Sequence, residues 1–159
     1  MNFNTELKKN IGCNIVYSSS GGGNSSIILM EFDNGNRIMT YCYWEVQKDG
    51  KLIATSEDDI TAVTGLVART IRLFENQKVV DIEIDESLNL FIEVEDGLTL
   101  LVFRDEYDHE DLEMLGDSQD WDYAVPSEDL VLYVMEDSTI KAGKRSSPRS
   151  DALKLIKMD

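Results

Sequence analysis

The residue types that carry most nucleophilic, metal-binding and redox chemistry are scarce in this chain of 159 residues, which has one histidine, two cysteines and two prolines. Any Ser/His/Asp or Cys/His catalytic group would have to use His109. The sequence contains neither an H-E-x-x-H pair nor a calcium loop of alternating aspartates. Cys13 and Cys42 lie in apolar stretches without a motif. A bridge between them would require neighbouring strands, and we expect two reduced thiols.

Long apolar runs are also absent. No stretch approaches the roughly 18 apolar residues that a membrane-spanning helix needs. The first ten residues, MNFNTELKKN, contain no apolar core of the kind found in a secretory signal. The sequence therefore predicts a cytoplasmic protein with no membrane partner.

Basic residues are almost missing from one segment. Residues 81–137 contain 20 acidic side chains and a single base, Arg104, whereas residues 1–80 have a net charge of −1 and residues 138–159 of +4. Such a segment repels phosphate backbones and attracts cationic surfaces at long range. We therefore expect a basic protein as its partner and no binding of nucleic acid.

Turn dipeptides divide the chain into short apolar-rich runs. Asn-Gly or Asp-Gly occurs within 32–36, 47–51 and 94–98, and this dipeptide supplies the positive φ angles of a tight β-hairpin. The predicted strands cover residues 11–17, 26–33, 36–46, 51–55, 78–85, 88–95, 98–104, 120–125 and 130–136. This pattern predicts an α+β fold that is predominantly antiparallel β.

One amphipathic helix is predicted over residues 57–75. Ser56 is a suitable N-cap, and acidic residues fill the first turn, where the helix dipole favours them. An apolar stripe recurs every three or four residues, at Ile60, Val63, Val67, Ile71 and Phe74. Gly65 lies inside this helix at a cost of about 1 kcal/mol relative to alanine.

An internal repeat relates the two halves of the chain. Placing Gly35 on Gly97 aligns residues 27–41 with 89–103, and a tryptophan follows each aligned segment, Trp44 and Trp121. We predict a single compact domain over 1–140, made of two repeated β-modules (about 1–55 and 76–137) that the helix joins. The basic tail, 141–159, has room for a short helix over 151–158 that Ser150 would cap.

The second copy contains an acidic insertion. Tyr41 leads almost directly to Trp44, whereas residues 104–120 separate Phe103 from Trp121. Insertions that a scaffold does not need are common places for function. The predicted partner-binding residues are Asp105, Glu106, Tyr107, Asp108, Glu110, Asp111, Glu113, Asp117, Asp120 and Asp122. The neighbouring strands extend this face with Glu83, Asp85, Glu93 and Glu95.

Metal binding and catalysis are the alternatives for the same segment. His109 and its neighbouring carboxylates suit weak calcium or magnesium binding, but their spacing matches no dedicated site. Neighbouring acids favour the protonated form of His109, which is the wrong form for a general base. Paired carboxylates also serve hydrolases, although such a pair needs one acid in an apolar pocket. We predict no catalytic, cofactor-binding or metal-binding residues.

The pattern VVDIEIDESLNLFIEVEDGLTLLVF, followed by DWDYAVPSEDLVLYV, resembles small acidic β-rich bacterial domains. Among these are immunity proteins of polymorphic-toxin and contact-dependent-inhibition systems. The resemblance covers about residues 79–135 and implies a non-catalytic protein that binds and blocks a cognate toxin. The acidic face suits a basic toxin, such as a nuclease. Alternatives are an acidic scaffold or DNA mimic that binds another cationic protein, or a hydrolase that uses paired carboxylates.

Overall fold

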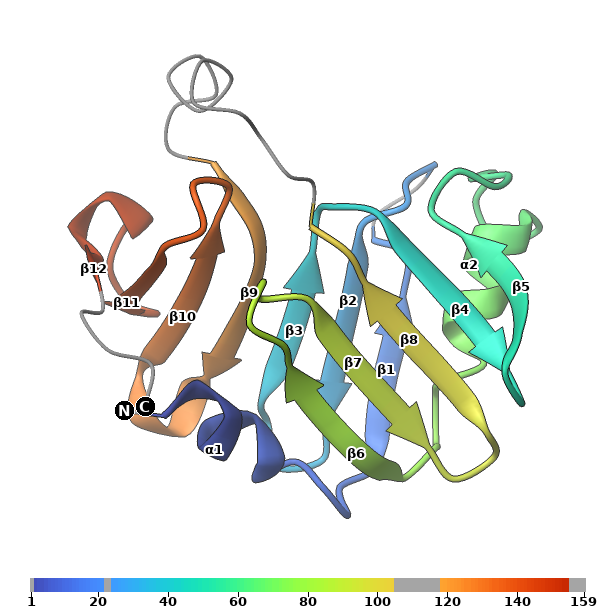
Figure 1. The fold of residues 1–159 in the computed structure, drawn as a ribbon, viewed down its shortest axis with the longest axis horizontal. Helices are drawn as coiled ribbons and strands as arrows, with labels where there is room; N and C mark the ends of the chain where they lie inside the picture. The colour runs from blue at the N-terminus through green and yellow to red at the C-terminus, as the bar shows by residue number, and fades with distance from the viewer. Residues whose placement is uncertain (1, 22–23, 105–117, 155–159) are drawn as a thin grey trace.

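The computed structural model describes residues 2–21, 24–104 and 118–154, which form two antiparallel β-sheets with one hydrophobic core between them (Figure 1). The seven-stranded sheet has the order β1 (Ile15–Ser19), β2 (Ile28–Phe32), β3 (Arg37–Thr40), β9 (Gln119–Val125), β10 (Leu130–Met135), β11 (Ile140–Lys144), β12 (Leu153–Lys154). The five-stranded sheet has the order β5 (Lys51–Thr55), β4 (Trp44–Lys48), β8 (Leu98–Val102), β7 (Leu90–Val94), β6 (Val79–Ile84). The predicted α+β, mainly antiparallel class is confirmed.

The three hairpins predicted from turn dipeptides are all present. They join β2 to β3, β4 to β5 and β7 to β8. Gly35, Gly50 and Gly97 have φ of +88°, +80° and +86°, which a side chain would disfavour. The predicted continuous strand 36–46 is wrong, because the chain leaves one sheet after Thr40 and enters the other at Trp44.

The two halves of the chain exchange strands between the sheets. The first half places β1, β2 and β3 in the seven-stranded sheet and then β4 and β5 in the five-stranded sheet. The second half does the reverse, with β6, β7 and β8 in the five-stranded sheet and β9 and β10 in the seven-stranded sheet. In each sheet, strands from the two halves meet at one strand pair. This pair is β3 with β9 in the seven-stranded sheet and β8 with β4 in the five-stranded sheet.

The two tryptophans occupy equivalent positions in this arrangement. Both are fully buried; Trp44 Nε1 donates a hydrogen bond to the Ser26 carbonyl (2.7 Å) and Trp121 Nε1 to the Leu88 carbonyl (3.0 Å). The two acceptors lie 62 residues apart in the chain, the same spacing that aligns Gly35 with Gly97. The repeat seen in the sequence therefore extends to matching side-chain contacts.

The helix α2 is shorter than predicted. It spans Leu66–Arg72 with Gly65 as its N-cap, whereas the prediction began at residue 57. The Asp59 carboxylate accepts hydrogen bonds from the backbone N–H and the hydroxyl of Thr61, so it stabilises a turn instead of a helix. A Cβ at Gly65 would lie 2.6 Å from the carbonyl oxygens of Asp59 and Thr61.

The burial of the predicted apolar stripe follows this shorter helix. Val67, Ile71 and Phe74 are buried as expected. Ile60 and Val63 are exposed, because they belong to the turns that precede α2. The prediction is therefore wrong for the first half of the stripe and confirmed for the second.

A helix that the sequence did not predict, α1 (Phe3–Lys8), packs against β6, while α2 packs against β1. The Asn2 side chain caps α1 by accepting from the Thr5 N–H. Phe3 is buried beside Trp121, with ring centroids 5.4 Å apart. Six helical residues are too few to display a period of 3.6, which explains why the pattern was missed.

The C-terminal segment extends the seven-stranded sheet. A 3₁₀ turn, η2 (Arg149–Asp151), separates β11 from β12, and Leu153 pairs with Ala142. The predicted helix over 151–158 is wrong for residues 151–154, because Asp151 ends the 3₁₀ turn and Leu153 and Lys154 pair as a strand with β11. A second 3₁₀ turn, η1 (Pro126–Glu128), connects β9 to β10. Cys13 and Cys42 form no disulfide.

Candidate partner-binding face

Most of the predicted partner-binding residues lie outside the described part of the chain. These are Asp105, Glu106, Tyr107, Asp108, Glu110, Asp111, Glu113 and Asp117. Two predicted residues, Asp120 and Asp122, are described, and both lie on β9. They occupy different environments from the exposed acidic face that the sequence suggested.

Asp120 is a buried structural residue. Its carboxylate accepts a hydrogen bond from Arg104 Nε at 2.8 Å, and both side chains are at most 5% exposed. The same guanidinium donates to the Ser87 and Met135 carbonyls, each at 2.8 Å. The prediction of Asp120 as a partner contact is wrong, because this ion pair holds it inside the protein. Its effect is to tie together the two ends of the insertion.

Asp122 lies on the outer face of the seven-stranded sheet. In the pairing register it stands opposite Met39 on β3 and Tyr133 on β10. Burial raises the pKa of its carboxyl group to about 6, while Arg37 and Arg149 act against that increase. The strand β9 belongs to the other sheet, so Asp122 does not join the carboxylates on β6 and β7.

The outer face of the five-stranded sheet carries a set of carboxylates. In β6 and β7 the apolar residues alternate inward, which leaves Asp81, Glu83 and Glu93 pointing outward, and Glu45 on β4 does the same. The side chains of Asp81 and Glu83 are 45% and 52% exposed. Lys8 Nζ lies 3.2 Å from Asp81 Oδ1 and 3.8 Å from Glu83 Oε2. Ion pairs as exposed as these contribute little to the free energy of unfolding.

A cluster of apolar side chains lies among these acids. Phe103 is stacked on Tyr43 with ring centroids 6.5 Å apart, and the edge of Phe91 meets Phe103 at 6.3 Å. Leu101 completes the cluster, since the sheet register places it directly between Phe91 and Glu45. All four side chains are half-buried on a face that no second layer of the described structure covers.

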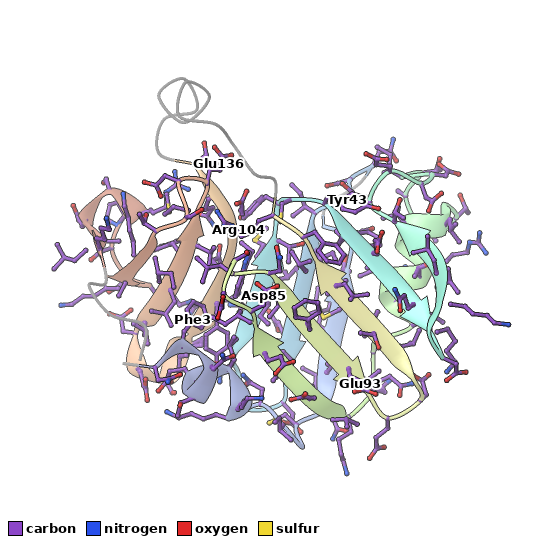
Figure 2. All side chains as sticks on the ribbon, in the orientation of Figure 1. Phe3, Tyr43, Asp85, Glu93, Arg104 and Glu136 are labelled. Atoms are coloured by element: carbon purple, nitrogen blue, oxygen red, sulfur yellow. The ribbon has the colours of Figure 1, made fainter. Side chains whose placement is uncertain are left out.

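We call this surface the aromatic-acidic face and define it by Tyr43, Glu45, Asp81, Glu83, Phe91, Glu93, Leu101 and Phe103. Figure 2 looks onto it, with Tyr43 at one end and Glu93 toward the other. The Tyr43 hydroxyl donates to Glu45 at 3.0 Å. Burial is the main cause that raises the pKa of the Tyr43 phenol above its usual value, and the hydrogen bond to the Glu45 carboxylate adds to the increase. The phenol therefore stays neutral. Its ring contacts Phe103 in the aromatic cluster, and its hydroxyl contacts the carboxylate of Glu45.

The aromatic cluster was missed by the sequence prediction, which named only the acids. A signal was present, because β7 and β8 carry apolar residues at outward positions as well as inward ones. The assembly of Tyr43 with Phe103 depends on the pairing of β4 with β8, which a linear pattern does not specify. The other two acids predicted to extend the face make local contacts instead. Asp85 accepts a hydrogen bond from the Asn89 N–H in the β6–β7 turn, and Glu95 forms an ion pair with Lys78.

Among the described residues, no three histidine, cysteine, aspartate or glutamate side chains converge as metal ligands would. No helix in residues 2–21, 24–104 or 118–154 has the length and apolar character needed to cross a bilayer. Comparison with known proteins gives no match to a family model, a curated protein or a solved structure.

Proposed function

We propose that this protein is a non-catalytic inhibitor that binds a basic partner protein through the aromatic-acidic face. The observation that supports this function best is the half-buried aromatic cluster with carboxylates around it, on an outward sheet surface. Protein interfaces are enriched in aromatic residues at their centres and have polar rims, and a few such anchors supply most of the binding energy. Carboxylates around the anchors suit lysine and arginine side chains.

The position of the acidic insertion is consistent with this proposal. Phe103, a member of the cluster, is followed after one residue by the insertion segment 105–117, which contains seven acidic residues. Electrostatic attraction of this kind speeds association and makes it sensitive to salt. The more specific role that we propose, an immunity protein that neutralises a toxin, is supported by the sequence resemblance to such proteins alone.

The test uses a catalytically inactivated form of the protein encoded by the adjacent reading frame, with its affinity measured by calorimetry and its association rate by stopped-flow fluorescence. Phe91→Ala should weaken binding at least about tenfold, because it removes an anchor from the cluster. Replacing Glu45, Glu83 and Glu93 together with glutamine should lower the association rate about tenfold at about 0.05 M salt and much less at about 0.3 M. Neutral substitutions at Asp105, Glu106, Asp108, Glu110 and Asp111 should act in the same direction.

The matched control is Glu31→Gln, which removes one carboxylate from the outer face of the other sheet. It should leave the affinity unchanged. Circular dichroism and thermal unfolding would establish that each variant is folded. Unchanged affinity of folded Phe91→Ala and of the triple glutamine variant would rule out this face as the binding surface.

A further inference from the structure

The outer face of the seven-stranded sheet holds a cavity of about 250 Å³ that the proposed function does not use. Its walls come from β2, β3, β9 and β10 and from the residue that follows β11. The polar side chains that line it are Arg37, Asp122, Tyr133 and Arg145, and its apolar floor includes Leu29, Met39 and Val131. A cavity with a charged wall and an apolar floor has the character of a small-molecule site.

Two arginines, Arg37 and Arg149, act on the carboxylate of Asp122, and a third, Arg145, lines the same cavity. Arg37 lines the cavity, and its Nη1 lies 3.6 Å from Oε1 of Glu31, a residue that does not line the cavity. Arg149 Nη1 donates to Gln119 Oε1 at 2.6 Å, and the Gln119 amide in turn donates to Asp122. Arg145 lines the cavity and makes no ion pair with any residue in the described ranges. The side chains that line the cavity include two guanidinium groups, of Arg37 and Arg145, and one carboxylate, of Asp122, in a protein whose overall charge is −16.

The positions of these arginines are fixed by the fold. Arg37 lies on β3 opposite Ala124 of β9, in the centre of the sheet. The backbone N–H of Arg145 donates to the Asp129 carbonyl at 3.1 Å, which attaches the end of β11 to the β9–β10 connection. Arg37 is therefore presented by a central strand, and Arg145 by the turn that follows β11, which this hydrogen bond attaches to the β9–β10 connection.

We propose that this cavity binds a small organic anion. The sulfonate, phosphate or carboxylate group of the ligand pairs with Arg37 and Arg145, and its apolar body lies on Met39 and Val131. Guanidinium groups recognise such oxyanions through paired N–H donors. Asp122 is the protein's own anion in the cavity, and it competes with the ligand for the positive charge.

This competition makes binding depend on pH. The groups that face Asp122 are Arg37 from β3, Tyr41 directly after β3, Tyr133 from β10, and Arg149 beyond β11. Burial raises the pKa of the Tyr41 and Tyr133 phenols, so both stay neutral between pH 5 and 8, whereas Asp122, with its pKa of about 6, changes from neutral to ionised. Affinity for an anion of constant charge should therefore fall as the pH rises through about 6.

The experiment is a titration of the ¹⁵N-labelled full chain with benzenesulfonate, which stays ionised throughout this pH range. Signals from β3, β9 and β10 should shift with the ligand, and benzyl alcohol, which lacks the charge, should produce no such shifts. Arg145→Gln should weaken binding about tenfold or more, while Arg69→Gln, at an exposed position on α2, is the matched control and should not. Asp122→Asn should bind more tightly at pH 7.5 and lose the dependence on pH.

Phenyl phosphate and benzoate, titrated in the same way, identify the head group that the site prefers. Equal affinity of Arg145→Gln and the unaltered chain would contradict the proposal, as would shifts spread over both sheets. An unchanged pH profile in Asp122→Asn would remove Asp122 from the site. The aromatic-acidic face is not involved in this experiment, so its outcome is independent of the proposed function.

Discussion

The aromatic-acidic face and the anion cavity occupy equivalent positions in the two halves of the chain. The 62-residue offset of the internal repeat aligns three residues of the cavity with three residues on the opposite sheet. Leu29 aligns with Phe91, Met39 with Leu101 and Arg37 with Thr99. Asp122 follows Trp121 as Glu45 follows Trp44. The same framework therefore presents two different surfaces, and the exchange of Arg37 for Thr99 and of Leu29 for Phe91 accounts for much of the difference.

The connections between the sheets also differ. In the first half, Tyr41, Cys42 and Tyr43 cross from β3 to β4, whereas the second half uses the long acidic insertion between β8 and β9. The repeat places Cys42 where the second half has Arg104, and Tyr43 where it has Asp120. The scaffold is shared, while two members of the aromatic-acidic face, Tyr43 and Phe103, lie at the crossings, where the halves diverge.

The largest expected effect comes from breaking the ion pair at the longer crossing. Arg104→Met should lower the free energy of unfolding by about 3–5 kcal/mol, because it leaves the buried Asp120 carboxylate without its charged partner. Urea denaturation measures this loss. The double variant Arg104→Met, Asp120→Leu should recover most of the stability, since a buried pair often breaks even against apolar residues. A double variant as unstable as the single one would show that the carbonyl contacts of Arg104 dominate instead.

The next effect tests whether the two tryptophans are as equivalent as their hydrogen bonds indicate. Trp44→Phe and Trp121→Phe should each cost about 2 kcal/mol, because each leaves a carbonyl, of Ser26 or Leu88, without its donor and removes buried volume. Thermal unfolding of both variants under the same conditions provides the comparison. Costs that differ by more than about 1.5 kcal/mol would show that the halves no longer share their energetics.

The smallest effect concerns a difference inside the core. Thr40 stands opposite Trp121 as Val102 stands opposite Trp44. The Thr40 side chain is fully buried, and its hydroxyl has no hydrogen-bond partner among the described residues. Thr40→Val should therefore raise the free energy of unfolding by about 1 kcal/mol. A destabilised variant would reveal that this hydroxyl has a partner after all, and Val102→Thr should be destabilising in either case.

Features coded over a few neighbouring residues were predictable from the sequence. The turns at Gly35, Gly50 and Gly97 follow from the need for positive φ, and the buried side of α2 and of the turn after it follows from the spacing of Val67, Ile71 and Phe74. The start of α2 was not predictable, because the Asp59 carboxylate competes with helix formation through its own turn. An N-cap candidate at Ser56 gives no warning of that competition.

The candidate site was only partly predictable, because its contacts cross long stretches of sequence. The acidic residues of β6 and β7 were visible in the alternation of those strands. The cluster of Tyr43 with Phe103 required knowledge that β4 pairs with β8. The burial of Asp120 depends on Arg104 reaching it from the far end of the insertion, and an ion pair of that kind has no sequence signature. Asp120 was therefore assigned to the wrong environment.

The exchange of strands between the sheets also has a consequence for synthesis. The strand β3 pairs with β9, which is translated only after β4 to β8. One edge of β3 therefore stays unpaired while these strands are synthesised. Neither sheet can be finished from one half alone, so the nascent chain exposes unpaired strand edges until translation is almost complete. The acidic residues concentrated in the second half give that growing chain a strong negative charge, which opposes premature association between copies during this interval.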